Sequence, residues 1–545
     1  MYRSPGWAVP GSFPYAPIHI QCGGFRDKTG NHPAALDRPS GVSHPSSEPS
    51  PTPPNWPHCG YGATADDPVG CRGIHVPGHT ACLAHLAEAD HDAYLATLSP
   101  GADIDHRGTP FAEGLLNQLL TALRNPATGN PRFGVARFDS VTFQDTAWFN
   151  SATFQDTAGF DSATFQGDAW FVRAVFERLT SLGPLVCAGR MVLSEAVFGG
   201  PVTLLLAARR LECRRTRWSS TAELRLRHAT VDFSQAVFEY PLTIAAEPKP
   251  FLLPNGQTME EHALAGAPSI GVRLASLRGV DAAHLVIADV DLSQCLFTGT
   301  VHLDQVQLEG ACSFGTVLLG THWVRWRPVR FTLRRTLAEE RCWRARRPAA
   351  VPGWNVEVSG AEHVGPAQLA PVYRALRKAF EDGKNEPGAA DFYYGEMEMR
   401  RHDRINTPRA ERGLLHAYWM LSGYGLRASR TLGWLAAAML LTIVLLMGFG
   451  IPQDDPKQEA TGTVPPGGGK VTFEIDKKDP QNPTGDRFTG ERFEKALNVT
   501  LNSVVFRSSG QDLTTAGAYI EMASRVTEPV LLGLAVLAIR NRVKR

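Results

Sequence analysis

The sequence lacks several features that would assign a chain of this length to a functional class. Its 55 Lys and Arg residues balance 54 Asp and Glu residues, so binding to nucleic acid through overall charge is not expected. The N-terminal residues contain no continuous apolar run followed by a small-residue cleavage site, so no secretory signal is predicted and we expect most of the chain in the cytosol. No C-x-x-C pair occurs among the nine cysteines, which favours buried thiols or a metal site over a disulfide framework.

Sequence patterns of catalysis are also missing. The chain contains no nucleophile elbow, no H-E-x-x-H, and no G-x-G-x-x-G placed between a strand and a helix. Cysteines, histidines and carboxylates are plentiful, but no spacing pairs them for acid–base or nucleophilic work. We therefore predict no catalytic residue and no cofactor-binding residue.

What the sequence does contain is a repeat. Phenylalanines recur at alternating steps of five and six residues, so the true period is eleven, and each is preceded two positions earlier by Ala or Val; these are Phe138, Phe143, Phe149, Phe154, Phe160, Phe165, Phe171 and Phe176. An eleven-residue period also suits a right-handed helical coiled coil. That alternative fails because positions two apart share a side of a strand but not of a helix. Thr, Asp, Asn and Gly are also poor helix formers. The repeat therefore predicts short strands with an inward small-x-Phe pair.

The same period continues in weaker form with Leu or Ile in place of Phe, as at 193–204, 233–244 and 292–314. We therefore expect a mainly-β solenoid over residues 131–320, interrupted by a loop insertion at 246–270, with the apolar column in its lumen as the main source of stability. This pattern resembles the pentapeptide-repeat family in the variant where five- and six-residue steps alternate. The resemblance implies a right-handed, quadrilateral-type β-solenoid.

Segments of other composition flank the repeats. Residues 1–56 are rich in Pro, Ser and Gly and predict a disordered tail, and residues 57–130 predict a Cys/His module followed by helices. Residues 321–430 begin with an Arg/Trp-rich segment of nine Arg against two Glu over 321–347. Two amphipathic helices follow over 369–404, which predicts an αα-hairpin.

Two apolar segments predict transmembrane helices. Residues 431–451 carry no charge over 21 positions, which is enough to cross a bilayer, and residues 516–541 form a less apolar second candidate. Basic residues precede the first span and follow the second, so the positive-inside rule predicts both termini in the cytoplasm of a two-span cell-membrane protein. The loop at 452–515 is then extracytoplasmic. We expect it to begin disordered and to contain a helix at 492–506.

Span, short helix and span form the layout of a two-helix ion-channel pore, and this region resembles the part of pentapeptide-repeat membrane proteins that is similar to a potassium-channel pore. A potassium filter needs a T-x-G-Y-G type run after the pore helix. Here Arg507-Ser508-Ser509-Gly510 stands at that place, and the only GYG, at 423–425, precedes the first span. We therefore expect a degenerate pore that acts in anchoring and oligomerisation.

A metal site is predicted in residues 58–86, where three cysteines lie among four histidines. The histidines are His58, His75, His79 and His85. Thiolate and imidazole are ligands that structural zinc prefers, and a Gly-rich segment with little core gains its fold from such a site. The predicted ligands are Cys59, Cys71, His79 and Cys82. Buried free thiols and surface histidines are the alternative.

The Arg/Trp segment has three interpretations: nucleic-acid binding, contact with anionic lipid headgroups, and a cap on the last coil. An acidic, DNA-mimicking rod is not expected, because five Asp without Lys or Arg over 138–171 give way to seven Arg against two Glu over 209–227. Nucleic acid is not an expected partner of the Arg/Trp segment either, because the segment lies between the solenoid and a membrane-proximal hairpin, where contact with headgroups or capping of the last coil accounts for its charge equally well.

The leading hypothesis is a non-enzymatic, membrane-anchored scaffold that forms homo-oligomers and binds an unidentified cytoplasmic protein. The alternatives are a channel-like protein with a non-potassium-selective pore, and a membrane-associated oxidoreductase.

Overall fold

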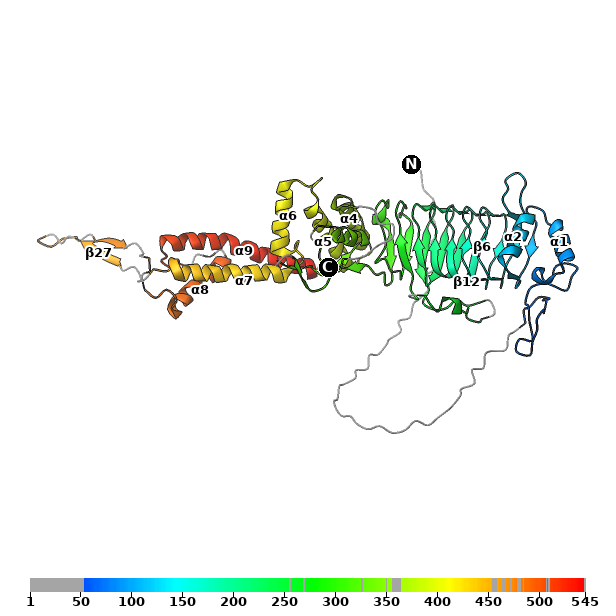
Figure 1. Cartoon of the computed structure of the whole chain (residues 1–545). Helices are drawn as coiled ribbons and strands as arrows, with labels where there is room; N and C mark the ends of the chain where they lie inside the picture. Colours follow the sequence, from blue (N-terminus) through cyan, green and yellow to red (C-terminus); the bar gives the residue numbers. More distant parts are fainter. Residues whose placement is uncertain are drawn as a thin grey trace, which may run out of the picture. The chain divides into compact units, whose positions relative to one another are not determined.

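The computed structural model describes residues 53–253, 256–267, 270–324, 327–348, 350–354, 364–452, 458–462, 466–470, 473–477, 482–483, 485–505, 507 and 510–543. The predicted disordered tail, 1–56, lies outside the described residues up to residue 52. A parallel β-solenoid follows, as the repeat predicted, together with a helical part that includes two long apolar helices (Figure 1).

One coil of the solenoid consists of four short strands. In the phenylalanine-rich part these are β4 (Ala136–Arg137), β5 (Thr142–Phe143), β6 (Ala147–Trp148) and β7 (Thr153–Phe154). The chain then returns to the first face, where β8 (Ala158–Gly159) pairs in parallel with β4. Ala136 pairs with Ala158, so one coil takes 22 residues, twice the sequence period. The next coil repeats the pattern with β9 (Thr164–Phe165), β10 (Ala169–Trp170) and β11 (Val175–Phe176).

Columns of aromatic rings fill the lumen. Phe143 and Phe165 stack with ring centroids 4.5 Å apart, Phe133 and Phe154 at 4.8 Å, and all four rings are buried. The Ala or Val two residues before each Phe is buried beside it, which confirms the inward small-x-Phe pair. These spacings match the distance of about 4.8 Å between hydrogen-bonded strands. The stacked rings are therefore spaced like the hydrogen-bonded strands that carry them.

The corners between faces are conformationally unusual. Ser140, Ser151 and Ser162 stand at eleven-residue intervals and adopt φ between 56° and 62°, a left-handed conformation that non-glycine residues rarely take. Each follows an inward Phe by two positions. Polar residues that follow the inward Phe are thus the sites where the backbone turns.

Beyond residue 180 several strands lengthen, and the first of them, at 181–192, pairs in parallel with both β9 and β10 and so runs along two successive faces. The main strands are β12 (Ser181–Val192), β14 (Val202–Glu212), β16 (Ala222–Arg227), β19 (Leu242–Ala246) and β21 (Leu285–Ala288). The remaining strands are β13 (Val197–Phe198), β15 (Arg217–Trp218), β17 (Thr230–Asp232), β18 (Val237–Phe238), β20 (Arg273–Ser276) and β22 (Gln307–Glu309). The η3 turn (Leu303–Gln305) precedes β22.

The predicted insertion at 246–270 leaves the coil and packs outside it. Its described residues include η2 (His262–Leu264), and its Phe251, Met259 and Leu264 form an apolar cluster with Val186 and Ala207 of β12 and β14. Glu261 holds the insertion by accepting from buried Arg227 at 2.5 Å.

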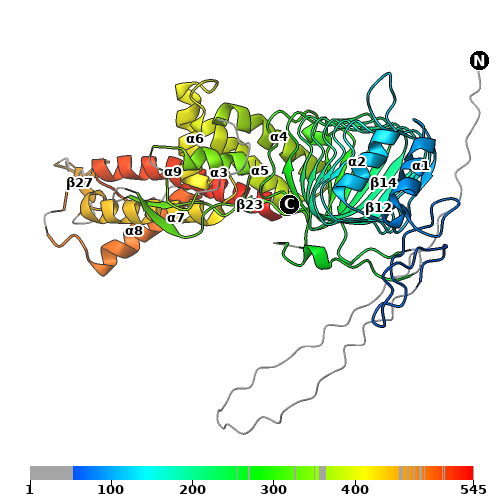
Figure 2. The ribbon, with the colours of Figure 1, turned by 45° about the vertical axis from the view of Figure 1, so that its right-hand side comes forward.

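The solenoid begins earlier than predicted. β1 (Ile104–Asp105) pairs with β4, and β2 (Pro110–Phe111) pairs with β5, so a coil already forms inside the segment expected to be only a Cys/His module with helices. Between β2 and β3 (Arg132–Phe133) the chain forms α2 (Glu113–Ala122), which lies at the N-terminal end of the solenoid (Figure 2). This helix buries Leu116, Leu119 and Leu120 in the solenoid core. Helix α1 (Glu88–Thr97) and the η1 turn (Leu83–His85) precede β1. The repeat period misses this coil because α2 interrupts it.

The predicted αα-hairpin covers the other end of the core. It consists of α4 (Pro366–Asp382) and α5 (Glu386–His402), and the aromatic rings of Phe380 and Phe392 contact Phe314 of the last coil. The Arg/Trp segment forms β24 (Thr321–Val324), β25 (Arg327–Arg330), β26 (Arg335–Thr336) and α3 (Ala338–Ala345). β26 pairs with β23 (Gly315–Thr316), and buried Glu339 of α3 accepts from the backbone of Phe297 and Thr298. This segment therefore acts as a cap on the last coil.

The C-terminal part contains α6 (Arg409–Ser422), α7 (Ala428–Leu445), the η4 π-turn (Leu446–Gly450), α8 (Gly490–Val504) and α9 (Thr515–Val543). α7 and α9 lie side by side in both views (Figures 1 and 2), and buried Glu528 of α9 accepts from Thr442 Oγ1 of α7 at 2.9 Å. The lengths and composition of Ala428–Gly450 and Thr515–Arg540 would allow both to cross a membrane.

The loop between these helices differs in part from expectation. The predicted helix is present as α8, whose Arg492 donates to the carbonyl oxygens of Met447 and Ile451 at the end of the first apolar helix. The start of the loop was expected to be disordered, but its described residues include an antiparallel pair, β27 (Gln458–Gly462) and β28 (Phe473–Lys477).

Candidate metal centre

Two extended stretches at the start of the described chain hold the first two cysteines side by side. Cys59 N–H donates to Gly73 O at 2.9 Å, and Gly60 N–H donates to Cys71 O at 2.8 Å. The Gly-rich sequence permits this close pairing. Gly70 has φ +63°, and a Cβ there would lie 2.8 Å from two backbone atoms. The pairing brings the Cys59 and Cys71 thiols to one side of the module.

A short turn supplies the other two ligand candidates. Cys82 precedes the η1 turn, and His85 N–H donates to Cys82 O at 2.9 Å. A single 3₁₀ turn places residues i and i+3 on the same side. The Cys82 thiol and the His85 ring therefore face the same point.

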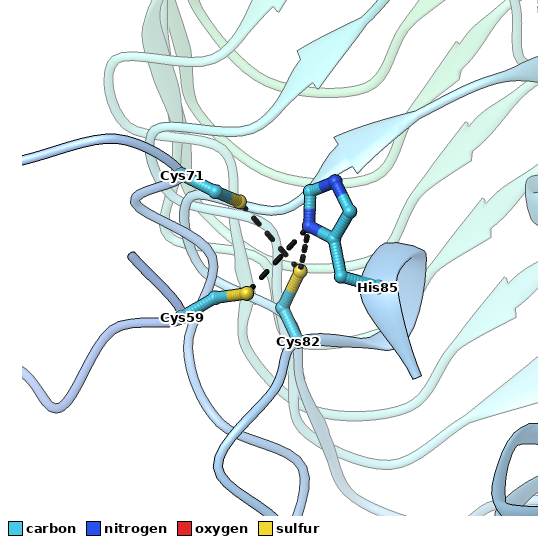
Figure 3. A group of neighbouring side chains, drawn as sticks. All are labelled: Cys59, Cys71, Cys82 and His85. Atoms are coloured by element: carbon cyan, nitrogen blue, oxygen red, sulfur yellow. Dashed lines mark hydrogen bonds between the residues drawn. The ribbon is translucent and has the colours of Figure 1, made fainter. Parts of the chain in front are cut away.

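Figure 3 shows these four side chains pointing toward one another. His85 Nδ1 lies 3.3 Å from Cys82 Sγ and 3.6 Å from Cys59 Sγ, and the Sγ atoms of Cys71 and Cys82 are 3.7 Å apart. All four ligand atoms lie within 4.8 Å of one another. Around a tetrahedral zinc with bonds of roughly 2.0–2.3 Å, ligand atoms are separated by about 3.6–3.8 Å. A Cys₃His cluster of this size could hold a metal ion.

The pKa values of the Cys71 and Cys82 thiols are shifted in opposite directions. The hydrogen bond with Cys82 lowers the pKa of Cys71 to about 5. The same hydrogen bond, together with burial, raises the pKa of Cys82. Thiolate is the form that binds metal. The lowered pKa of Cys71 therefore favours the form of this thiol that binds metal.

The structure brings together Cys59, Cys71 and Cys82 of the four predicted ligands, but it does not bring His79 to them. His79 lies in the tight turn closed by the hydrogen bond from Val76 N–H to Ala81 O, and its Nδ1 lies 3.8 Å from a carboxylate oxygen of Asp90 in α1. His85 takes the fourth place. The sequence signal for His85 is its C-x-x-H spacing from Cys82, which sets it apart from the other three histidines of the segment.

The cluster is attached directly to the first coil. Ile74 N–H donates to Arg107 O at 2.8 Å, and the Arg107 guanidinium lies over the Trp56 ring, 4.9 Å from its centroid. The side chain of Cys82 fills the space beside Gly73, where a Cβ would lie 2.8 Å from Cys82 Sγ. Tyr61 covers the open side by stacking on the His85 ring at 4.2 Å. A metal ion at this point would tie residues 59–85 to the start of the solenoid.

A second group of functional interest is a buried ionic network that the sequence did not reveal. Glu340 of α3 accepts from Arg334 at 2.5 Å and from Arg344 at 2.7 Å, and Glu398 of α5 accepts from Arg344 at 3.3 Å and from Arg401 at 2.6 Å. All five side chains are buried. Two buried cations of the Arg/Trp segment, Arg334 and Arg344, are thus neutralised inside the cap together with Arg401 of α5.

This network also explains the isolated GYG sequence. Tyr424 is buried, and its hydroxyl donates to Glu398 Oε2 at 3.1 Å. Gly423 and Gly425, which flank it, have φ of 55° and 71°, so the tripeptide forms a tight turn between α6 and α7. The GYG sequence therefore links the cap to the start of the first apolar helix.

Comparison with known proteins supports the repeat assignment. Residues 138–183 match the family described as pentapeptide repeats (9 copies). No curated protein and no solved structure matches the chain. The family match covers the phenylalanine-rich coils and supports a repeat scaffold.

Proposed function

We propose that this protein is a membrane-anchored scaffold: its solenoid presents a binding surface on the cytoplasmic side, and α7 and α9 fix that surface to the bilayer. No catalytic step is part of the proposal. The expected partners are an unidentified cytoplasmic protein, the lipid membrane and further copies of this chain, whereas nucleic acid is not an expected partner.

The observation that carries the proposal is the exposure of apolar side chains along α7 and α9. Only 33% of the most apolar window of Ala428–Gly450 is buried, and only 28% of that of Thr515–Arg540. A core helix of a soluble protein would be mostly buried, and water disfavours an exposed apolar surface of this size. The exposed residues include Leu432, Trp434, Leu440, Leu441, Val444, Val526, Val530, Val536, Leu537 and Ile539. A bilayer is the environment that suits them.

The connection to the cap makes the helix pair a firm anchor. Arg427, directly before α7, donates to Leu333 O at 2.9 Å, and Arg430 donates to Trp419 O at 2.7 Å. Together with the hydrogen bond from Tyr424 to Glu398, these contacts join α7 to both α6 and the cap. The basic residues before α7 and near the end of α9 support a cytoplasmic location for both termini.

Alkaline extraction of membranes tests the anchor. We expect the full chain to stay in carbonate-washed membranes and to be released by detergent. The double variant Leu440→Arg/Leu441→Arg should lose membrane retention, since each Arg near a helix centre costs about 2.5–3.5 kcal/mol on insertion. Leu252→Arg is the matched control, because Leu252 is 69% exposed in the solenoid insertion. Release of the wild-type chain by carbonate, and its purification in water as an oligomer, would show that other copies cover the helices instead.

We also propose that the Cys₃His cluster binds zinc in a structural role. The donor set and its spacing support this proposal, and bound zinc would cross-link residues 59–85. Metal analysis of the purified full chain should find one zinc per chain. His85→Ala should weaken binding by more than the roughly 10–100-fold typical of losing an outer partner. His79→Ala should retain the metal. A metal-free wild-type protein, or loss of zinc only in the His79 variant, would contradict the assignment.

A channel-like role is the second candidate. The observation that favours a channel is the contact between α8 and α9. Buried Ser503 of α8 hydrogen-bonds with Ser524 of α9 at 3.0 Å, so polar groups lie between these two helices. Planar-bilayer recordings of reconstituted protein test this role. Single-channel currents would favour it, and their absence with both Na⁺ and K⁺ at all potentials would reject it.

A further inference from the structure

A cationic cleft lies between the cap and α6. It has a volume of about 1260 Å³ and is bounded by β25, α3, the beginning of α4, the end of α5 and α6. Pockets that hold drug-sized ligands usually measure about 300–1,000 Å³. The cleft is therefore large enough for a small organic anion or for the headgroup of a lipid.

Arginines dominate the walls of the cleft. Eight arginines line it, against the two carboxylates of Glu398 and Asp403. Glu398 is already engaged with Arg344 and Arg401, and Asp403 Oδ1 accepts from the backbone N–H groups of Ile405 and Asn406. Arg334 pairs with Glu340. The carboxylates near the cleft are therefore occupied by other partners.

Five arginines remain, which we call the free arginines: Arg330, Arg347, Arg404, Arg409 and Arg412. Among the residues that the structure describes, none of the five forms a side-chain ion pair, and Arg412 Nε is buried without a hydrogen-bond partner. Burial and the neighbouring charges of Arg344 and Arg404 lower the pKa of Arg347. Burial also lowers the pKa of His402 to about 4, so this histidine of the wall is neutral at pH 7. The wall contains one other histidine, His416.

Uncompensated guanidinium groups in a partly enclosed cleft favour an anion. Guanidinium groups bind phosphate through paired hydrogen bonds, and such charge-assisted bonds are stronger than neutral ones. Gly365, Pro366 and Ala367 at the start of α4 also line the cleft, so the positive end of that helix dipole adds to the field. We propose that this cleft binds the phosphate group of an anionic ligand, with Arg404, Arg409 and Arg412 as its principal contacts.

The surroundings indicate where such a phosphate could come from. Apolar rings of Phe331, Trp343 and Trp354 line the same cleft. α6, which carries Arg409 and Arg412, is followed after five residues by α7 and exposes Leu414. If α7 spans the bilayer, as proposed above, phospholipid headgroups lie beside the cleft. A soluble phosphate ester is the other source, and recognition of its phosphate does not depend on membrane anchoring.

Binding to the full chain in a neutral detergent tests the proposal. The probes are glycerol phosphate for the soluble source, and mixed micelles containing phosphatidylglycerol for the lipid source. Phosphatidylcholine micelles are the reference of zero net charge, because the choline cation neutralises their phosphate. Quenching of tryptophan fluorescence reports binding, because Trp343, Trp354 and Trp419 line the cleft. Saturable binding of either anionic probe supports the proposal. Preference for the micelles over glycerol phosphate identifies the lipid as the source.

Variants decide whether the free arginines are responsible. Arg409→Gln/Arg412→Gln should weaken binding at least about 100-fold, since each charge-assisted contact contributes a factor of about ten or more. Arg404→Gln, at a position whose side chain is exposed, should weaken it about tenfold without affecting the fold. Arg178→Gln/Arg209→Gln removes two exposed solenoid arginines as the matched control.

Three results would overturn the proposal. These are the absence of saturable binding to both anionic probes, unchanged affinity in the Arg404 and Arg409/Arg412 variants, and much tighter, competing binding of a short RNA. Release of the wild-type chain from membranes by carbonate would rule out a membrane lipid as the source of the phosphate. It would leave the phosphate-binding proposal itself standing, because the glycerol phosphate measurement does not require membrane insertion.

Discussion

Removing the charge of Glu398 should uncouple the cap from the first apolar helix. The buried carboxylate of Glu398 accepts from Arg401 at 2.6 Å, from Arg344 at 3.3 Å and from the Tyr424 hydroxyl at 3.1 Å. Glu398→Gln keeps the shape of the side chain but leaves two buried arginines with less counter-charge. Breaking one side of a buried ion pair typically costs about 3–5 kcal/mol.

The pKa of Glu398 gives an independent magnitude. Burial alone would raise this pKa, but the charges of Arg401 and Arg344 outweigh burial and lower it from 4.5 to about 2. A depression of that size corresponds to about 3 kcal/mol of stability. Because the folded-state pKa is the lower one, this stability is fully present above pH 4.5. It is lost as the pH falls from 4.5 towards 2.

Thermal unfolding of the full chain in detergent, followed by far-UV circular dichroism, measures the effect. At pH 7 we expect Glu398→Gln to lower the melting temperature by several degrees, and between pH 4.5 and 3 its stability should fall less steeply than that of the wild type. Glu411→Gln is the control, because Glu411 forms a surface pair with Arg400 at 2.5 Å and such pairs contribute about 0–1 kcal/mol. Equal melting temperatures and parallel acid profiles for wild type and Glu398→Gln would refute this reasoning.

Two further predictions concern the solenoid and the helix pair. Phe160 is fully buried and stacks on Phe138 at 5.3 Å, so Phe160→Ala should cost about 3–5 kcal/mol in a denaturant titration, whereas Val237→Ala at a half-exposed position should change little. An unchanged midpoint for the Phe160 variant would show that the lumen tolerates a cavity. Thr442→Val removes the hydrogen-bond partner of buried Glu528 and should lower thermal stability in detergent by roughly 1 kcal/mol; an unchanged melting temperature would show that this hydrogen bond does not hold α7 to α9.

Much of the solenoid was predictable because its signal is local and repeated. The inward Phe and its small partner two residues earlier are enough to define a strand with one buried face. The period does not reveal that two eleven-residue units make one coil, since both units place a Phe in the same lumen. It also misses β1 and β2, because α2 separates Phe111 from its stacking partner Phe143.

The sites were harder to predict because their residues are brought together by folding. Cys59, Cys71 and Cys82 could be grouped by their density in the sequence, but choosing among four histidines required the local turn at His85. The arginine cleft combines residues from β25 to α6, and its charge depends on which arginines Glu340 and Glu398 neutralise. Composition showed an excess of Arg but could not separate paired from unpaired guanidinium groups.

The difference between period and coil has a consequence for insertions and deletions. In the phenylalanine-rich region, adding 22 residues would insert a whole coil and lengthen the stack by about 4.8 Å, leaving every face in register. Adding eleven residues would preserve the sequence rhythm equally well, yet it would shift the chain by two faces. Everything before the insertion, including the metal centre, would then be turned by about half a revolution around the solenoid axis. Sequence length thus sets both the reach of the solenoid and the direction in which its first coil faces.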